Sequence, residues 1–237
     1  MKIVGIMQVG LDSPWIKYSL PNMKSLVDET ILLIGTRSKK QRDAFDRSAI
    51  PLQVDESTIE LEFHGKEWDG VNLAIRKASE LNPDWLFFMD SDEVIVATRE
   101  RFESLVKKKA MHLFKKIWLW KDEYHYRVDA PQKFQTFTSY TCLIPYHEKL
   151  KMDRPHPFWL RIDWGRKVFQ SPVIEKHSDI IVKHYQALDQ KNYKRKQLNT
   201  VIEILKRNPL QNDKELSERF IPHFEEPAIE PLPKEWL

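Results

Sequence analysis

Two aspartates one residue apart, in the segment Asp90-Ser91-Asp92-Glu93, have the residue types and spacing best suited to chemistry in this sequence. The segment directly follows the apolar run Trp85 to Met89, so both carboxylates are expected at the end of a buried strand. Holding two carboxylates in one small volume is unfavourable unless a cation lies between them. Such oxygen ligands suit Mg2+ or Mn2+, which also bind substrate phosphates. The alternative is a solvated acidic turn that caps the next helix, and the spacing alone leaves both open.

Strand and helix patterns alternate along the chain before the acidic segment. Short apolar runs predict strands at Ile3–Val9, Thr30–Ile34 and Ile50–Val54. Apolar residues at helical spacing predict helices from Ile16 to Val27 and from Lys66 to Leu81. This alternation is typical of an α/β fold with a central, mostly parallel sheet flanked by helices. Ligands of such sheets bind at the carboxyl ends of the strands, which is where the acidic segment falls.

The second half of the chain is dense in aromatic residues and gives weaker patterns. Thr98 is expected to cap a helix that carries Phe102 and Leu105 on its buried face. Strands and loops are expected at Leu113–Trp120, Lys133–Ile144 and Phe158–Trp164, and a last short strand at Ile180–Lys183. A last helix is expected, with Lys191 to Lys196 along its first half and Leu198, Val201, Ile202 and Leu205 at helical spacing.

The segment Asp84 to Val94, with the sequence DWLFFMDSDEV, resembles the strand and DxD motif of family 2 glycosyltransferases of the GT-A fold. Residues 1–38 are similar to the opening strand, helix and second strand of that family, with Val27-Asp28-Glu29-Thr30-Ile31 in place of its usual Val-Asp-Glu-Ile stretch. The motif Asp90-Ser91-Asp92 in its strand context is the specific part of the resemblance, which covers most of the chain around a vague middle.

The resemblance also implies roles for single residues. Asp90 would contact the ribose of a nucleotide or the metal, and Asp92 would ligate the metal. Gly65-Lys66 and Asn72 resemble the phosphate-side residues of the family. By this resemblance the side chains of Lys66 and Asn72 would lie near a diphosphate. Lys183-His184-Tyr185 resembles its late His-Tyr segment, so His184 would be a further metal ligand or a diphosphate contact.

The chain departs from the family at the end of the second strand. The family usually has an aspartate there that reads the nucleotide base, whereas this sequence has Gly35-Thr36-Arg37-Ser38. Arg37 is instead expected to meet a phosphate, and Asp12 or Asp55 to take over base recognition.

Sugar transfer with inversion requires a carboxylate that accepts the proton of the acceptor hydroxyl, while the metal stabilises the departing diphosphate. The transition state resembles an oxocarbenium ion. Because the family places its base well after the DxD motif, we favour Asp163 and Glu175 over the other downstream acids Asp122, Glu123, Asp129 and Glu148. Aromatic rings could form a platform for an acceptor sugar, although most are expected in the core: Trp118, Trp120, Tyr124, Tyr126, Trp159 and Trp164.

Composition limits the classes of protein and of partner. The formal net charge of +3 over 237 residues is too small to indicate a nucleic-acid-binding protein. The one cysteine, Cys142, excludes an internal disulfide and fits a reducing cytoplasm. The longest apolar runs are too short to span a bilayer. We expect one GT-A-like catalytic domain over residues 1–221, with a nucleotide-sugar half at 1–95, an acceptor half and C-terminal helix at 96–221, and an extended Pro-rich tail at 222–237.

The sequence thus predicts a metal-dependent glycosyltransferase that moves a hexose-type sugar from a nucleotide-diphosphate donor to a glycan or other hydroxyl acceptor, with Mn2+ or Mg2+ as cofactor. A second reading is a phosphatase of the haloacid-dehalogenase type with Asp90 as nucleophile, because an apolar strand followed by Asp-x-Asp also resembles that motif. A third is a non-catalytic protein of the same fold that binds a sugar or nucleotide. Fold alone does not decide among them.

Overall fold

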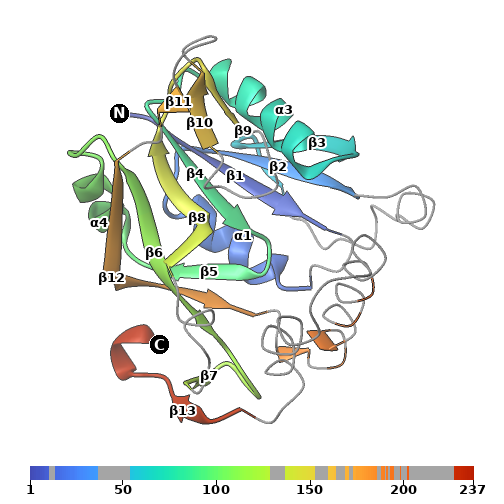
Figure 1. Cartoon of the computed structure of the whole chain (residues 1–237), viewed down its shortest axis with the longest axis vertical. Helices are drawn as coiled ribbons and strands as arrows, with labels where there is room; N and C mark the ends of the chain where they lie inside the picture. The colour runs from blue at the N-terminus through green and yellow to red at the C-terminus, as the bar shows by residue number, and fades with distance from the viewer. Residues whose placement is uncertain are drawn as a thin grey trace. The chain divides into compact units, whose positions relative to one another are not determined.

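The structure is a computed structural model of the whole chain (Figure 1). Its residues form two compact units. It describes residues 1–10, 14–36, 54–128, 137–152, 160–163, 169–170, 173–185, 188–189, 191, 193–194, 198, 202 and 227–237. The first unit comprises Met1–Lys115 and Phe137–Val182, and the second comprises Lys116–Thr136 and Lys183–Leu237. Each of the two units draws on two separate stretches of the chain. The expected catalytic domain over residues 1–221, with halves at 1–95 and 96–221, stays a prediction.

Four neighbouring parallel strands form one half of an eight-stranded sheet. In spatial order they are β3 (Thr58–His64), β2 (Glu29–Thr36), β1 (Ile3–Val9) and β4 (Trp85–Asp90). Residues of β1 alternate between the two faces of the sheet, with Ile3 and Met7 in one apolar core and Val4 and Ile6 in the other. Because both faces are covered, β1 and β4 read as continuous apolar runs in the sequence.

The other half of the sheet begins where β4 pairs antiparallel with β8 (Phe137–Pro145), which pairs antiparallel with β6 (Met111–Trp118). β12 (Ile174–His184) and β5 (Glu93–Val96) follow in the strand order. Cys142 of β8 is fully buried between Phe88 and Leu113 of the neighbouring strands.

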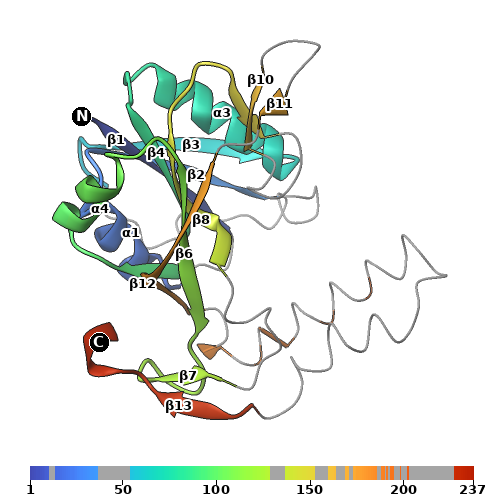
Figure 2. The same ribbon diagram turned by 60° about the vertical axis from the view of Figure 1, so that its left-hand side comes forward.

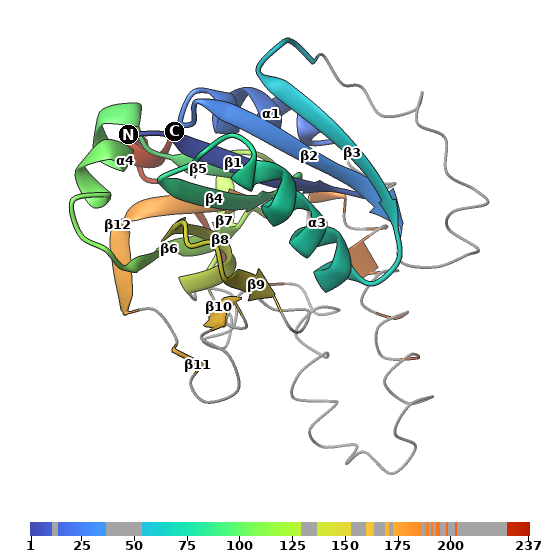
Figure 3. The ribbon, with the colours of Figure 1, turned by 90° about the horizontal axis from the view of Figure 1, so that it is seen from above.

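Helices cover both faces of this sheet, as Figure 3 shows for α1 and α3. α1 (Ile16–Lys24) and α4 (Arg99–Leu105) contribute to one core, and α3 (Glu67–Ser79) contributes Val71, Ala74 and Ala78 to the other. Thr98 caps α4 by accepting a hydrogen bond from the backbone N–H of Arg101, as the sequence predicts. The expected α/β class, with a central sheet flanked by helices, is confirmed.

A second, three-stranded sheet lies beside α3 (Figure 2). It consists of β9 (Leu150–Met152), β10 (Leu160–Asp163) and β11 (Phe169–Gln170), all antiparallel. Asn72 of α3 joins this helix to the small sheet. Its side-chain amide donates to the carbonyl of Met152 at 2.7 Å and accepts from the N–H of Met152 at 2.8 Å.

The second unit contains a two-stranded sheet of β7 (His125–Arg127) and β13 (Ile229–Pro231), followed by a 3-10 turn, η5 (Lys234–Trp236). Within the predicted tail, Ile229–Pro231 is a strand that pairs with β7, and Lys234–Trp236 is a 3-10 turn. Tyr193, which is fully buried, packs against Trp118 and Trp120 in an aromatic cluster. The described positions of the expected last helix, at 191, 193–194, 198 and 202, are helical.

The third strand of the parallel half differs from the expectation. We expected it at Ile50–Val54, but β3 is Thr58–His64; Val54 lies outside any strand, and residues 50–53 are outside the described residues. Searching the described residues for a membrane-spanning helix finds none of sufficient length and apolar character.

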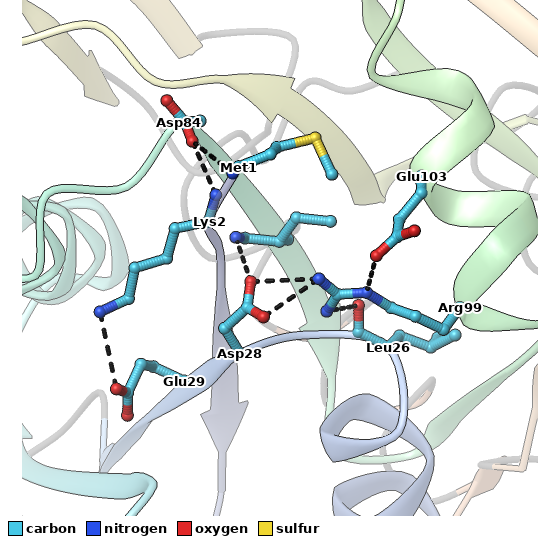
Figure 4. A network of polar contacts seen from close by, with 9 residues as sticks. Met1, Lys2, Leu26, Asp28, Glu29, Asp84, Arg99 and Glu103 are labelled. Atoms are coloured by element: carbon cyan, nitrogen blue, oxygen red, sulfur yellow. Dashed lines mark hydrogen bonds and ion pairs between the residues drawn. The ribbon is translucent and has the colours of Figure 1, made fainter.

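The amino-terminal ends of the parallel strands are joined by a network of polar contacts (Figure 4). The carboxylate of Asp28 accepts from the backbone N–H of Ile3 at 2.7 Å. Its two oxygens also accept from Nη2 of Arg99, at 3.0 and 3.2 Å. Arg99 also donates to the carbonyl of Leu26 and to Glu103. Asp84, directly before β4, accepts from the N–H of Lys2 at 2.6 Å. Ion pairs and backbone bonds thus hold β1, β2, β4 and α4 together at this edge.

Candidate functional site

The carboxyl ends of the four parallel strands meet at one edge of the sheet. The register pairs Gln8 of β1 with Asp90 of β4, and Thr36 of β2 with His64 of β3. Loops that leave these strands therefore start side by side, which is the arrangement that forms ligand sites in α/β proteins. The sequence-based prediction that Asp90 ends a buried strand at such an edge is confirmed.

The turn between β4 and β5 is fixed by its central residue. Ser91 is buried; its N–H donates to the carbonyl of Gln8 at 3.2 Å, and its own carbonyl accepts from the hydroxyl of Ser19 at 2.8 Å. Asp90 and Asp92 flank this anchor and are both partly exposed. Glu93, which is fully buried, accepts a hydrogen bond from Thr141 of β8. The turn therefore holds two partly exposed carboxylates on an anchored backbone at the carboxyl edge of the parallel strands.

Lys66 lies at the same edge, at the start of α3. Its backbone is extended and caps the helix, its side chain is exposed, and its ammonium lies 5.4 Å from the centre of the Trp68 ring. The N–H groups of the first turn of a helix carry partial positive charge, and a lysine beside them adds a full charge. This combination suits a phosphate-bearing ligand.

Gly35, the first residue of the segment Gly35-Thr36-Arg37-Ser38 discussed above, lies against the neighbouring strand. A Cβ atom at this position would come within 1.6 Å of the carbonyl oxygen of Phe63. No side chain fits there unless β2 and β3 move apart. The glycine is therefore required by the close pairing of the two strands.

Asp55, which the sequence suggested for base recognition, precedes β3 and therefore lies at the amino-terminal edge of the parallel strands. The first residue of β3 pairs with Thr30 near the start of β2. Its carboxylate accepts from the hydroxyl of Ser57 at 2.7 Å and pairs with Lys24, and the Lys24 hydrogen bond lowers its pKa. These contacts hold the loop before β3. Asp12, the other residue considered, is outside the described residues.

Two further predicted site residues have structural partners away from the acidic turn. Asn72, expected near a diphosphate, uses its amide to hold the backbone of Met152, as described above. Glu175, expected as a catalytic base, pairs with Lys108.

Glu175 lies at the opposite end of the sheet from Asp90. Its neighbour His112 packs against Trp85, the first residue of β4, with ring centres 5.7 Å apart, whereas Asp90 is the last residue of that strand. Five residues of strand separate the two ends by about 17 Å. Glu175 is therefore withdrawn as a candidate base. Its position after the DxD motif in the sequence does not show that β12 starts at the opposite end of the sheet.

His184 belongs to the second unit and is buried there. Its ring packs on Trp118 with centres 4.2 Å apart, and its carbonyl accepts from the N–H of Leu119. Burial lowers the pKa of the preceding residue, Lys183. A role for His184 as metal ligand or diphosphate contact stays a prediction.

The remaining predicted residues have little or no described geometry. Arg37 is outside the described residues. Asp163 ends β10, and its backbone pairs with Phe169, but its side chain is outside the described part. Ser19, which sequence reasoning missed, fixes the acidic turn from α1. Its polar type on the apolar face of a predicted helix was the feature that could have identified it.

Comparisons with known proteins give only weak similarities. The chain matches no protein-family model and no curated protein. Among solved structures, TarS 1–349 from S. aureus has a TM-score of 0.44 and 14% identity over 94% of this chain and 71% of that chain. TarS 1–349 has also been solved in complex with UDP-GlcNAc.

Two other solved structures show similar values. The mannosyltransferase PcManGT from Pyrobaculum calidifontis, in complex with GDP-Man and Mn2+, has a TM-score of 0.47 and 11% identity over 94% of this chain and 68% of that chain. GalNAc-T7, solved with UDP, GalNAc and Mn2+, has a TM-score of 0.46 and 8% identity over 94% of this chain and 57% of that chain. These values are too low to assign a function to this chain.

Proposed function

We propose that this chain is a metal-dependent glycosyltransferase of the GT-A type that takes a sugar from a nucleotide-diphosphate donor. The observation that carries the proposal is the anchored turn Asp90-Ser91-Asp92, which presents two partly exposed carboxylates at the carboxyl edge of four parallel strands. An acidic pair at this place suits a cation that in turn binds a diphosphate.

Asp90 and Asp92 would hold the metal, since their oxygen donors fit Mn2+ or Mg2+ and the buried Ser91 keeps the turn in place. When bound, the metal would stabilise the negative charge of the leaving diphosphate. Lys66 and the first turn of α3 would bind phosphate oxygens from the neighbouring loop. The residues of this edge thus offer both an anion-binding and a cation-binding part for one ligand.

The base for an inverting transfer is proposed to be Asp163, the candidate that remains after Glu175 is withdrawn. It would accept the proton of a hydroxyl on a glycan or other acceptor. The transferred group is proposed to be a hexose-type sugar. A cytoplasmic location and the absence of a nucleic-acid partner also remain predictions.

Ligand-dependent thermal unfolding tests the donor site. The full chain would be heated with uridine, guanosine, thymidine or cytidine diphosphate, each with Mn2+ and with EDTA. A ligand that binds only the folded state at 100 times its Kd adds about 2.7 kcal/mol of stability, so at least one diphosphate should raise the Tm in Mn2+ and not in EDTA. Failure of all four diphosphates in Mn2+ would contradict the proposal.

Activity measurements separate the two alternatives. A nucleotide-dependent Tm shift without sugar transfer or nucleotide release would indicate a non-catalytic binding protein. Release of phosphate from simple phosphomonoesters, abolished by Asp90→Asn, would instead indicate the phosphatase with Asp90 as nucleophile.

A further inference from the structure

Two histidines and a glutamate converge at the starts of β6 and β12, away from the acidic turn. Nδ1 of His112 lies 2.9 Å from Nε2 of His177, and one ligand atom from each of these histidines and from Glu175 lies within 4.8 Å of the others. Among the described residues, no other group of three or more His, Cys, Asp or Glu side chains has its ligand atoms this close together.

The strand geometry explains why the three side chains meet. Glu175 and His177 are two residues apart on β12, so both point to the same face of the strand. The N–H of Met111 on β6 donates to the carbonyl of Val173 at 2.7 Å, which sets the starts of β6 and β12 side by side. His112 therefore reaches the face that carries Glu175 and His177.

The hydrogen bonds of His112 orient its ring as a ligand. Its Nε2 lies 3.1 Å from the carbonyl oxygen of Lys108, an acceptor, so Nε2 carries the proton and Nδ1 presents a lone pair toward His177. Histidines that bind metals usually donate their other N–H to a carbonyl or carboxylate in this manner. His177 donates from its Nε2 to this lone pair of His112. If that proton moved to Nδ1 of His177, Nε2 of His177 would become a second metal ligand, and the ring would stay neutral without net loss of a proton.

The surroundings of the three groups favour neutral histidines and allow access. His112 is buried, whereas His177 and Glu175 are partly exposed. Burial lowers the pKa of both histidines. The cations and acids that face the cluster are Lys108, which pairs with Glu175, and Arg101, which pairs with Asp179 at 2.6 Å. The Lys108 side chain is 70% exposed, so it can swing into solvent and release Glu175.

We propose that His112 Nδ1, His177 Nε2 and a carboxylate oxygen of Glu175 bind one Zn2+ ion, with water as the fourth ligand. Two imidazole nitrogens and one carboxylate with an open position form a zinc ligand set, and imidazole favours Zn2+ over Mn2+ or Mg2+. The ion would tie the start of β6 to the start of β12. This site is separate from the acidic turn and does not depend on the proposed transferase activity.

Zinc titration of the metal-free full chain, by calorimetry and by competition with a chromophoric chelator, tests the site. We expect one equivalent to bind at pH 7.5 in the wild type and equally in Asp92→Asn, which removes the acidic turn as a source of binding. His177→Ala and Glu175→Gln change partly exposed side chains and should weaken binding by more than the ~10–100-fold that loss of an outer hydrogen-bond partner causes. Lys108→Ala, which removes the cation now on Glu175, should tighten it.

Controls keep the result tied to this cluster. His147→Ala removes a histidine elsewhere in the first unit and should leave zinc affinity unchanged, and circular dichroism should show each variant folded. Co2+ added in place of Zn2+ should give the intense visible absorption of a tetrahedral site, lost in His177→Ala. Zinc uptake that is absent in the wild type, or equal in the wild type, His177→Ala and Glu175→Gln, would overturn the proposal.

Discussion

Acidic residues lie at both ends of the parallel strands, and the two ends differ in what surrounds them. At the amino-terminal edge, Asp28 and Asp84 accept hydrogen bonds from strand N–H groups, and Asp28 also pairs with Arg99 (Figure 4). At the carboxyl edge, Asp90 and Asp92 flank a buried serine that fixes the turn between them. The comparison teaches that residue type alone does not separate a carboxylate that holds strands together from one that a turn leaves partly exposed at the carboxyl edge.

The largest effect is expected for Asp92→Asn compared with Asp84→Asn, at opposite ends of β4. Loss of a metal ligand should reduce sugar transfer by about 100-fold or more, because the metal contributes several kcal/mol of charge stabilisation. Asp84→Asn should leave transfer within about two-fold, because the asparagine keeps an oxygen that can accept from the N–H of Lys2 and the residue lies at the other end of β4 from the acidic turn. Nucleotide release from a panel of nucleotide sugars in Mn2+ measures both. Equal losses would show that the two ends do not differ as proposed.

Ser19→Ala should show that the acidic turn depends on its anchor. The substitution leaves the buried carbonyl of Ser91 without the hydroxyl donor, which costs about 1–3 kcal/mol of folding stability. A looser turn should also raise the Mn2+ concentration needed for half-maximal activity. Ser25→Ala is the matched control, since Ser25 bonds only locally to the carbonyl of Asn22 and is exposed. An unchanged Mn2+ requirement in Ser19→Ala would argue against the anchor.

Arg99→Ala tests the other edge and should affect stability alone. Arg99 joins Asp28, Glu103 and the carbonyl of Leu26, and these contacts are partly exposed. We expect a loss of about 1 kcal/mol in urea unfolding, since charged hydrogen bonds contribute more than isolated surface ion pairs. The Mn2+ requirement should not change. A large loss of activity in a folded Arg99→Ala protein would mean that the two edges are coupled.

The smallest effect is expected from pH acting on His112 and His177. Burial places their folded-state pKa values below the ordinary 6.5, so the unfolded chain takes up protons first as the pH falls. Their contribution to stability is therefore present above pH 6.5 and declines as the pH falls from there through the lowered folded-state values. Urea unfolding at several pH values in EDTA measures the decline, which should be shallower in His177→Ala. An identical slope would show that these histidines do not titrate on unfolding.

Local patterns were sufficient to predict β1, β2 and β4 of the parallel half of the fold. β1, β2 and β4 are buried on both faces along most of their length, so each contains a run of mostly apolar residues in the sequence. α3 follows from apolar residues at helical spacing, and the position of Asp90 follows from the end of its strand. β3 was missed because it is an edge strand in which Ile59, Leu61 and Phe63 alternate with polar residues, and only continuous apolar runs were taken as strands.

Contacts between distant parts of the chain were not predictable in this way. Glu175 meets His112 only because β12 lies beside β6 in the sheet, and no local pattern reports which strands become neighbours. The bond from Ser19 to Ser91 likewise joins α1 to a turn 72 residues later. Site residues chosen by their order along the chain were therefore the least secure part of the prediction.

The burial of Cys142 makes the natural chain suitable for labelling at one chosen position. It is the single cysteine of the sequence, no part of it is exposed, and burial raises the pKa of its thiol, so maleimide dyes should not react with it in the folded protein. A cysteine introduced at the exposed Asp69, near the start of α3, would then be the reactive thiol. A fluorophore there would report whether a nucleotide binds near the start of α3, without any need to replace the native cysteine first.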